Sequence, residues 1–107
     1  MDEICEVVVT GPNSDWLVAF TRRLVEDRVA ACGHNLNAIR SIYRWQGEIH
    51  DDQEARVALH TRKALVSRIV DRANVEHPYD VPCVIALPIV DGNADYIAWV
   101  NSETADR

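Results

Sequence analysis

The stretch Ser41-Ile42-Tyr43-Arg44-Trp45-Gln46-Gly47 decides the fold. It closes a strand that the interleaved apolar and polar residues predict from Leu36 to Trp45. Gln46-Gly47 indicates a bulge or bend, and the acidic residues that follow predict an exposed turn around Asp51-Asp52. The alternation from Glu54 to His60 then predicts a returning strand, so this part of the chain is expected to form a long β-hairpin.

The segments on either side of the hairpin alternate between strand and helix. Their β-branched runs, apolar stripes and capping residues predict a strand at 4–10, a helix from 14 to 32, a helix from 61 to 75 capped by Thr61, a strand at 83–90 and a helix at 94–100. Pro88 is expected at a sheet edge or bulge, and the tail from Asn101 is expected to fray. Tyr96, Ile97, Trp99 and Val100 are expected to face inward.

This order is β-α-β-β-α-β with an extra C-terminal helix, which is the α+β, ferredoxin-like arrangement. The 107 residues, 48% hydrophobic and 26% charged, predict a single domain over 1–107. The net charge of −6 argues against nucleic acid as a partner, because phosphate binding relies on Lys and Arg. No apolar run is long enough to span a membrane, and Met1-Asp2-Glu3 lacks the basic start of a secretory signal, so a cytoplasmic location is expected.

The common catalytic signatures are missing from the sequence, so an enzyme is not expected. Cys5, Cys32 and Cys83 have no C-x-x-C spacing and are expected to be free thiols. Metal binding is the chemistry left open, and Glu76-His77 is its best-placed pair because Pro78 holds His77 extended. An adjacent His and carboxylate are also common without any metal, so a purely structural role stays open for this pair.

Two motifs resemble the CutA divalent-cation tolerance family. They are Ser41 to Gly47 and His77-Pro78-Tyr79-Asp80-Val81-Pro82, and further matching pieces extend the resemblance over nearly the whole chain. The resemblance implies a ferredoxin-like fold, a homotrimer assembled through the long hairpin, and tolerance of copper and other divalent metals. It implies no established catalytic reaction.

The resemblance also implies site residues. Tyr43 and Trp45 are predicted at the trimer interface, because exposed aromatics on edge strands favour pairing, although packing inside the subunit is the alternative. Glu76 and His77 match two copper ligands of the family, whereas the family's strand-one cysteine aligns with Val9, which cannot bind metal. Cys83 is proposed as the replacement thiol, because an antiparallel last strand would start beside Val9; a buried packing role is its alternative.

The predicted function is therefore a trimeric, copper-binding or divalent-metal-binding protein of cation tolerance. Two other functions remain open at this point. The first is a trimeric small-molecule sensor with a ligand cleft between subunits, and the second is a trimer that docks partners and has no metal site.

Overall fold

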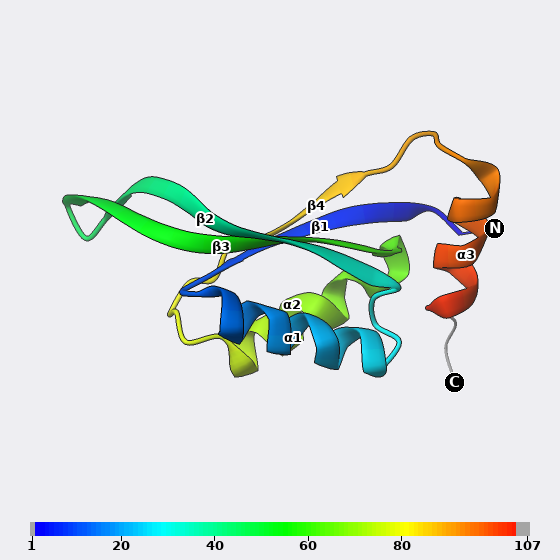
Figure 1. Ribbon diagram of the computed structural model, residues 1–107, viewed down its shortest axis with the longest axis horizontal. Helices are drawn as coiled ribbons and strands as arrows, with labels where there is room; N and C mark the ends of the chain where they lie inside the picture. The colour runs from blue at the N-terminus through cyan, green and yellow to red at the C-terminus, as the bar shows by residue number, and fades with distance from the viewer. Residues whose placement is uncertain (1, 105–107) are drawn as a thin grey trace.

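A four-stranded antiparallel sheet in the order β2-β3-β1-β4 is the framework of the computed structural model, which describes residues 2–104 (Figure 1). The elements are β1 (Ile4–Gly11), α1 (Ser14–Glu26), β2 (Cys32–Trp45), β3 (Glu48–Arg62), a short 3-10 helix η1 (Lys63–Leu65), α2 (Val66–Glu76), β4 (Val84–Pro88) and α3 (Ala94–Glu103). This order and pairing confirm the predicted α+β, ferredoxin-like fold with an added C-terminal helix.

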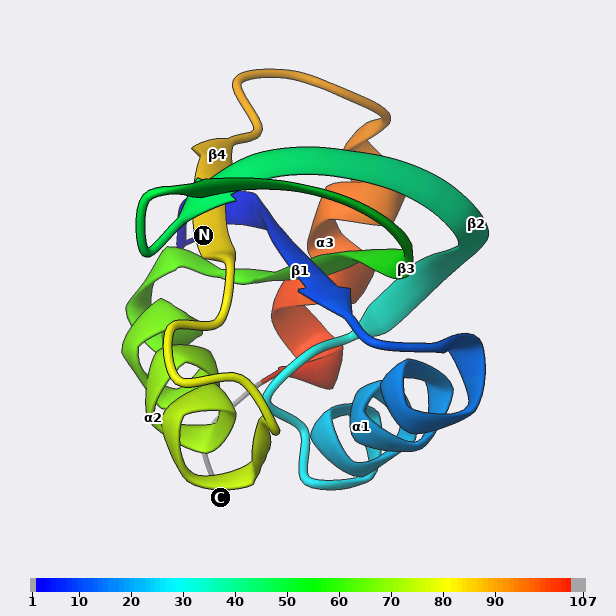
Figure 2. The ribbon, with the colours of Figure 1, turned by 90° about the vertical axis from the view of Figure 1, so that its left-hand side faces the viewer.

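Helices α1 and α2 cover one face of the sheet, and the main core lies between these two layers (Figure 2). The buried side chains of the layer contact are Cys5, Val7, Val9, Leu17, Phe20, Leu24, Ala55, Val57, Leu59, Ile69 and Ala73. Each large apolar side chain buried in this way contributes about 1.5–3 kcal/mol. Gly33 allows β2 to approach α1, since a Cβ there would lie 2.5 Å from the Thr21 methyl group. The core therefore fixes the two helices against the sheet.

The hairpin turns at Gln46-Gly47 rather than at Asp51-Asp52, so the predicted turn position is wrong. Gln46 and Gly47 have φ values of 50° and 81°, and Trp45 pairs directly with Glu48, which defines a two-residue turn of the type I′ kind. The two aspartates lie inside β3 instead, because cross-strand partners hold them there. Asp51 accepts two hydrogen bonds from Arg40 at 2.8 and 2.6 Å, and Asp52 accepts one from the Tyr43 hydroxyl at 2.6 Å.

A β-bulge between Leu36 and Ile39 divides the hairpin into an inner and an outer part. Ala38 within it has a φ of 63°, and such bulges bend a strand and increase its twist. Beyond the bulge the hairpin extends past the ends of α1 and α2 (Figure 1). The longest extent of the chain, 45 Å, reflects this projection.

Helix α1 is shorter than the periodicity predicts. Asn13 caps it by accepting a hydrogen bond from the Trp16 amide at 2.9 Å, as expected, but the helix ends at Glu26 instead of residue 32. The chain reverses at Arg28, which has a φ of 61°, and the amides of Val29 and Ala30 donate back to the Leu24 carbonyl. This reversal buries the apolar residues that follow the helix. Their burial explains why the apolar pattern in the sequence predicted a helix longer than the one observed.

Thr61 does not cap a helix, so that prediction is also wrong. It is a strand residue paired with Cys5, and its hydroxyl donates to the Val29 carbonyl at 2.6 Å. Strand β3 continues to Arg62, and α2 begins only after η1. Strand β4 is shorter than predicted, but it is an edge strand that ends at Pro88, which confirms the edge position predicted for this proline.

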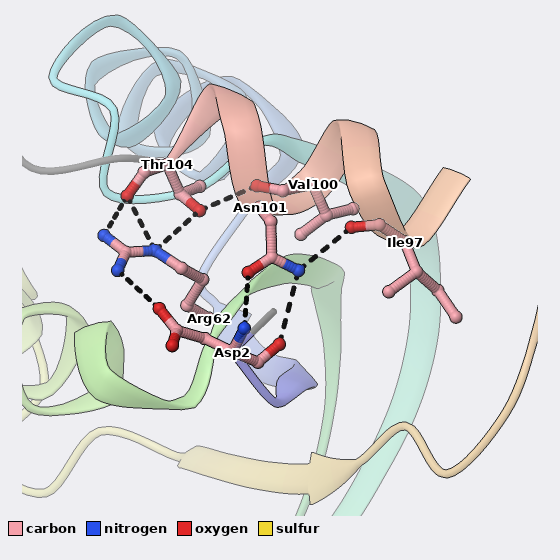
Figure 3. A network of polar contacts seen from close by, with 6 residues as sticks. All are labelled: Asp2, Arg62, Ile97, Val100, Asn101 and Thr104. Carbon is pink, nitrogen blue, oxygen red and sulfur yellow. Dashed lines mark hydrogen bonds and ion pairs between the residues drawn. The ribbon is translucent and has the colours of Figure 1, made fainter. Parts of the chain in front are cut away.

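Helix α3 packs across the end of the sheet and continues to Glu103, three residues beyond its predicted end at Val100. Val100 is fully buried, and Tyr96 and Ile97 pack beside it, as expected, whereas Trp99 is 41% exposed and does not face inward. Asn101 is not frayed, because its side chain accepts from the Asp2 amide and donates to the Asp2 carbonyl (Figure 3).

Arg62 fixes the C-terminal end of α3 to the sheet (Figure 3). Its guanidinium group donates to the carbonyl and the hydroxyl of Thr104 and forms an ion pair with Asp2 at 3.0 Å. The side chain is only 12% exposed, and a cation beside the last carbonyls of a helix also complements the helix dipole. Arg62 therefore joins residues from both ends of the described chain.

Candidate functional site

A pocket of about 760 Å³ lies between the outer part of the hairpin and the connection from α2 to β4. We call it the hairpin pocket. Its walls include Tyr43, Trp45 and Glu54 from the hairpin and Tyr79, Asp80 and Cys83 from the connection. Thr10, at the end of β1, also lines it. The two family-like motifs of the sequence thus meet in one place.

The hairpin wall of this pocket carries aromatic groups that remain accessible. Tyr43 is 43% exposed and Trp45 is 40% exposed, so these two residues do not belong to the core of the folded chain. The Tyr43 ring stacks on His50 at 5.2 Å between centroids, and its hydrogen bond to Asp52 raises the pKa of the phenol. The wall is therefore amphipathic: it presents aromatic rings, and the hydroxyl group of Tyr43 holds its ring in place through Asp52.

A hydrogen bond across the pocket ties the opposite wall to the hairpin. The Tyr79 hydroxyl donates to Oε2 of Glu54 at 2.7 Å. Partial burial, followed by the hydrogen bond and charge of Glu54, raises the pKa of Tyr79 above its ordinary value. Tyr79 belongs to one of the family-like motifs of the sequence. Its partner Glu54 could not be predicted from the sequence, because only the folded chain brings residues 54 and 79 together.

His77 directly precedes Pro78, which lines the pocket, and is itself 7% exposed. Its Nε2 donates to the Thr10 carbonyl at 2.7 Å, and its Nδ1 accepts from the Tyr79 amide at 3.1 Å. The ring also packs against Trp16, with 4.6 Å between centroids. Both ring nitrogens are therefore used within the protein, and a metal ion could bind only by replacing one of these hydrogen bonds.

Glu76 points toward α1 instead of toward the pocket. Its carboxylate pairs with Arg23 at 2.9 Å and with Arg72 at 2.5 Å. Burial raises the pKa of Glu76, but the hydrogen bonds and charges of Arg72 and Arg23 outweigh burial and leave the pKa below its ordinary value. The carboxylate is thus the centre of an ion-pair network that joins α1 and α2.

Cys83 is exposed at the rim of the pocket. Val84, the first residue of β4, pairs with Val9, so the last strand starts beside the end of the first as predicted, but Cys83 precedes this strand and is not part of it. However, Cys83, Glu76 and His77 do not come together as one ligand set. Between residues 2 and 104, no group of three or more His, Cys, Asp or Glu side chains is arranged to hold a metal ion. These three residues as placed do not fit a copper ion as a single site.

The fold and this pocket define a class of protein: a small, ferredoxin-like α+β protein whose long hairpin carries an exposed aromatic surface. Comparison with known proteins gives the family within this class. The family model described as CutA1 divalent ion tolerance protein matches residues 5–103. The chain belongs to the CutA1 divalent ion tolerance family.

Individual relatives agree with this assignment. The chain is 38% identical over 104 residues to the divalent-cation tolerance protein CutA of Thermus thermophilus, covering 97% of this chain and 99% of the relative. It is 41% identical over 96 residues to human protein CutA, covering 90% of this chain but only 54% of the relative, so the chain spans about half the length of that protein.

Solved structures show the same likeness. The crystal structure of CutA1 from Oryza sativa superimposes with a TM-score of 0.95 at 32% identity and covers 99% of this chain and 97% of the other. The structure from Thermus thermophilus gives a TM-score of 0.90 at 37% identity, covering 98% and 100%. As for membranes, the helices described between residues 2 and 104 are too short or too polar to cross one.

Proposed function

We propose that this chain acts in divalent-cation tolerance as a homotrimer joined through its long hairpins, in a binding role and not a catalytic one. One observation carries the trimer: the outer hairpin exposes large apolar side chains on both of its strands. They are Ile42 at 67%, Tyr43 at 43%, Trp45 at 40% and Ile49 at 67% exposed. Apolar strands of this kind favour association, and burying them against neighbouring subunits would offset the cost of their exposure.

The edges of the sheet support the same proposal. β2 and β4 are the two edge strands, so each presents backbone groups along its outer side that can pair with another chain. The side chains of Ile85 and Leu87 are also exposed, so edge strand β4 carries apolar groups of its own. A trimer can use both edges, because each subunit offers one edge to each of its neighbours. The cytoplasmic location predicted from the sequence is part of this proposal.

The experiment that tests the trimer is the solution mass of the wild type and of two matched variants. Trp45 and Trp99 are 40% and 41% exposed, so Trp45→Lys and Trp99→Lys make the same change at equal exposure. We expect a wild-type mass of three chains that persists at micromolar concentration. Trp45→Lys is expected to shift the mass toward the monomer, and Trp99→Lys is expected to retain the trimer. A monomeric wild type would refute the proposal.

Copper binding is the finer part of the proposed function, and Cys83 is the residue that supports it. Glu76 and His77 are occupied by protein partners, whereas Cys83 is exposed in a pocket that also contains the carboxylates Glu54 and Asp80. A thiolate is the ligand type that Cu(I) prefers. We expect Cu(I) titration of the reduced protein to lose binding in Cys83→Ser and to keep it in His77→Gln. Equal affinity in Cys83→Ser and wild type would remove Cys83 from the proposal.

The hairpin pocket also favours a second candidate, a small-molecule sensor. Its volume of about 760 Å³ falls within the range of roughly 300–1,000 Å³ that is usual for ligand pockets, and its aromatic walls suit an organic ligand. A thermal-shift screen with nucleotides and metabolites distinguishes a small-molecule sensor from a metal-binding protein. A stabilising compound whose effect is lost in Tyr79→Phe would favour the sensor over the metal.

A further inference from the structure

The connection from β4 to α3 holds the one place in the sequence where an aspartate or asparagine directly precedes a glycine, Asp91-Gly92 (Figure 1). Both residues are exposed and lie outside any helix or strand. The backbone amide of Gly92 donates a hydrogen bond to Oδ1 of Asp91 at 2.9 Å. Because Cγ is bonded to Oδ1, the glycine nitrogen and the carboxyl carbon of the preceding side chain lie close to one another.

This contact brings together the two atoms that can close a five-membered ring. The N–H bond of Gly92 points at the carboxyl group of Asp91, so loss of the amide proton leaves a nitrogen lone pair that faces the same group. Holding two reacting groups in such an orientation speeds an intramolecular step. Gly92 has no Cβ, so no side chain of its own shields the nitrogen from the carboxyl carbon.

We propose that Asp91 is a modification site, at which aspartate converts to isoaspartate without an enzyme. The Gly92 nitrogen bonds to Cγ of the protonated Asp91 carboxyl group, and the amide proton and the carboxyl hydroxyl leave as one water molecule. The product is a succinimide ring. Water then adds to the former backbone carbonyl carbon and opens the ring there, so the main chain runs through Cγ and the old backbone carbonyl becomes a carboxylate. The atoms balance without an oxidant, a reductant or a cofactor.

Asn13-Ser14 shows what the fold does to a comparable pair. Asparagine before serine can form the same ring, but the side-chain oxygen of Asn13 accepts from the Trp16 amide at 2.9 Å, and Ser14 is the first residue of α1. The helix cap thus commits the carboxamide to the Trp16 nitrogen instead of to the next nitrogen along the chain. We therefore expect modification at Asp91 and none at Asn13.

The modified residue would lie between two fixed points of the connection. On one side the Ile89 amide donates to the Ile4 carbonyl at 3.2 Å, and on the other the Asn93 side chain caps α3 by accepting from the Tyr96 amide at 3.0 Å. Isoaspartate adds one methylene group to the main chain between these points. The added length is expected to loosen the Asn93 cap and the first turn of α3.

This inference goes beyond the proposed function and does not rest on it. Asp91 and Gly92 line no part of the hairpin pocket and are separate from the exposed apolar side chains of the outer hairpin. A monomeric wild type, or a protein that binds no metal, would leave the chemistry at Asp91 unchanged.

The test follows isoaspartate in the folded, full-length protein during incubation at physiological temperature. An isoaspartyl methyltransferase counts it by transferring a labelled methyl group from S-adenosylmethionine to the new carboxylate. We expect label to accumulate in wild type, to accumulate several-fold more slowly in Gly92→Ala, and to be lost in Asp91→Glu, whose longer side chain would need a six-membered ring. The matched control is Asp95→Glu, in the first turn of α3, which should take up label as wild type does.

Digestion of the wild type with endoproteinase Asp-N locates the modification, because this enzyme cuts before aspartate but not before isoaspartate. Unmodified protein yields the fragments 80–90 and 91–94, and modified protein yields 80–94 in one piece. A synthetic peptide of residues 86–97 gives the rate without the fold, and we expect the folded protein to react at least as fast. Hydrogen exchange of the incubated protein is expected to become faster in the first turn of α3.

Three results would overturn the inference. The first is the absence of label in folded wild type, and the second is label that persists in Asp91→Glu. The third is a folded protein that reacts far more slowly than the peptide, because the fold would then hold the Gly92 nitrogen and the Asp91 carboxyl carbon apart. Unchanged hydrogen exchange in modified protein would overturn the effect assigned to the Asn93 cap.

Discussion

The imidazole of His77 donates a hydrogen bond from Nε2 to the backbone carbonyl of Thr10, 2.7 Å away. This bond joins the connection between α2 and β4 to the end of β1. Because Nδ1 also accepts from the Tyr79 amide, the same ring holds the connection in its bent path at the edge of the hairpin pocket. His77 is thus placed to shape the pocket, which is a different task from the metal ligation that the sequence suggested.

Replacement of His77 is expected to affect stability before it affects metal binding. His77→Ala leaves the Thr10 carbonyl and the Tyr79 amide without their partner and is expected to lower the free energy of unfolding by roughly 2–3 kcal/mol. Urea denaturation measures this loss. Val75→Ala, at a side chain 85% exposed on α2, is the control and should change stability by less than about 0.5 kcal/mol. A stable His77→Ala variant that has lost copper would restore the ligand prediction.

The hairpin turn offers a test of backbone strain alone. Gly47 has a φ of 81°, and a Cβ there would meet no atom within 4 Å, so Gly47→Ala changes the backbone energy and no packing. We expect a loss of about 1 kcal/mol, measured by thermal unfolding. Gly92→Ala is the matched control, because its Cβ would make an ordinary contact with Ile97 at 3.7 Å. Equal effects at both glycines would argue against a left-handed turn.

The network around Arg62 is expected to hold α3 in place. Arg62→Met keeps much of the side-chain volume but removes the bonds to Thr104 and Asp2, and it should cost about 2 kcal/mol. Hydrogen exchange over residues 94–104 is expected to become faster, while exchange in β1 changes less. The control is Lys63→Met, because the Lys63 side chain is 75% exposed and its amine lies 3.6 Å from Glu3; this change should cost less than about 1 kcal/mol. Unchanged exchange in Arg62→Met would show that α3 is held by its apolar contacts.

The lowered pKa of Glu76 predicts that the free energy of unfolding depends on pH. Its pKa is lowered in the folded chain, so its ion pairs stabilise the protein above the unfolded pKa of about 4.3, and this contribution is lost as pH falls through the lower folded pKa. Glu76→Gln is expected to be less stable than wild type by about 1 kcal/mol at pH 7, with the gap closing in acid.

Urea denaturation at several pH values measures the gap between Glu76→Gln and wild type. The control is Glu103→Gln, since the Glu103 carboxylate lies 3.8 Å from Arg28, at the limit of an ion pair. That control should differ from wild type by less than about 0.5 kcal/mol at every pH tested. A gap for Glu76→Gln that stays constant down to acid pH would mean that the ion pairs with Arg23 and Arg72 contribute nothing.

The elements that the sequence predicted well are those whose burial pattern matches their periodicity. The strand at 4–10 and the start of the helix at residue 94 were placed correctly, because β-branched residues and the Asn93 cap act locally. The predictions were wrong where residues distant in the sequence determine the local structure. Asp51 and Asp52 favour turns in isolation, but Arg40 and Tyr43 hold them in β3, and the apolar residues after Glu26 are buried by a chain reversal and not by a helix.

The candidate site shows the same limit more clearly. The two motifs that line the hairpin pocket could be found from the sequence, and so could the position of Cys83 beside the first strand. The hydrogen bond from His77 to the Thr10 carbonyl could not be predicted, because every residue has a backbone carbonyl and the residue type at position 10 does not indicate such a bond.

The position of Arg62 has a mechanical consequence. Because one guanidinium group bonds both Asp2 and Thr104, a force that pulls residues 2 and 104 apart acts first on a clamp of a few charged hydrogen bonds, loaded side by side. Beyond that clamp the load passes into β1, which is one of the two central strands and is paired on both sides. Under tension α3 is therefore expected to detach as a first, low-force event, before the sheet ruptures at a higher force.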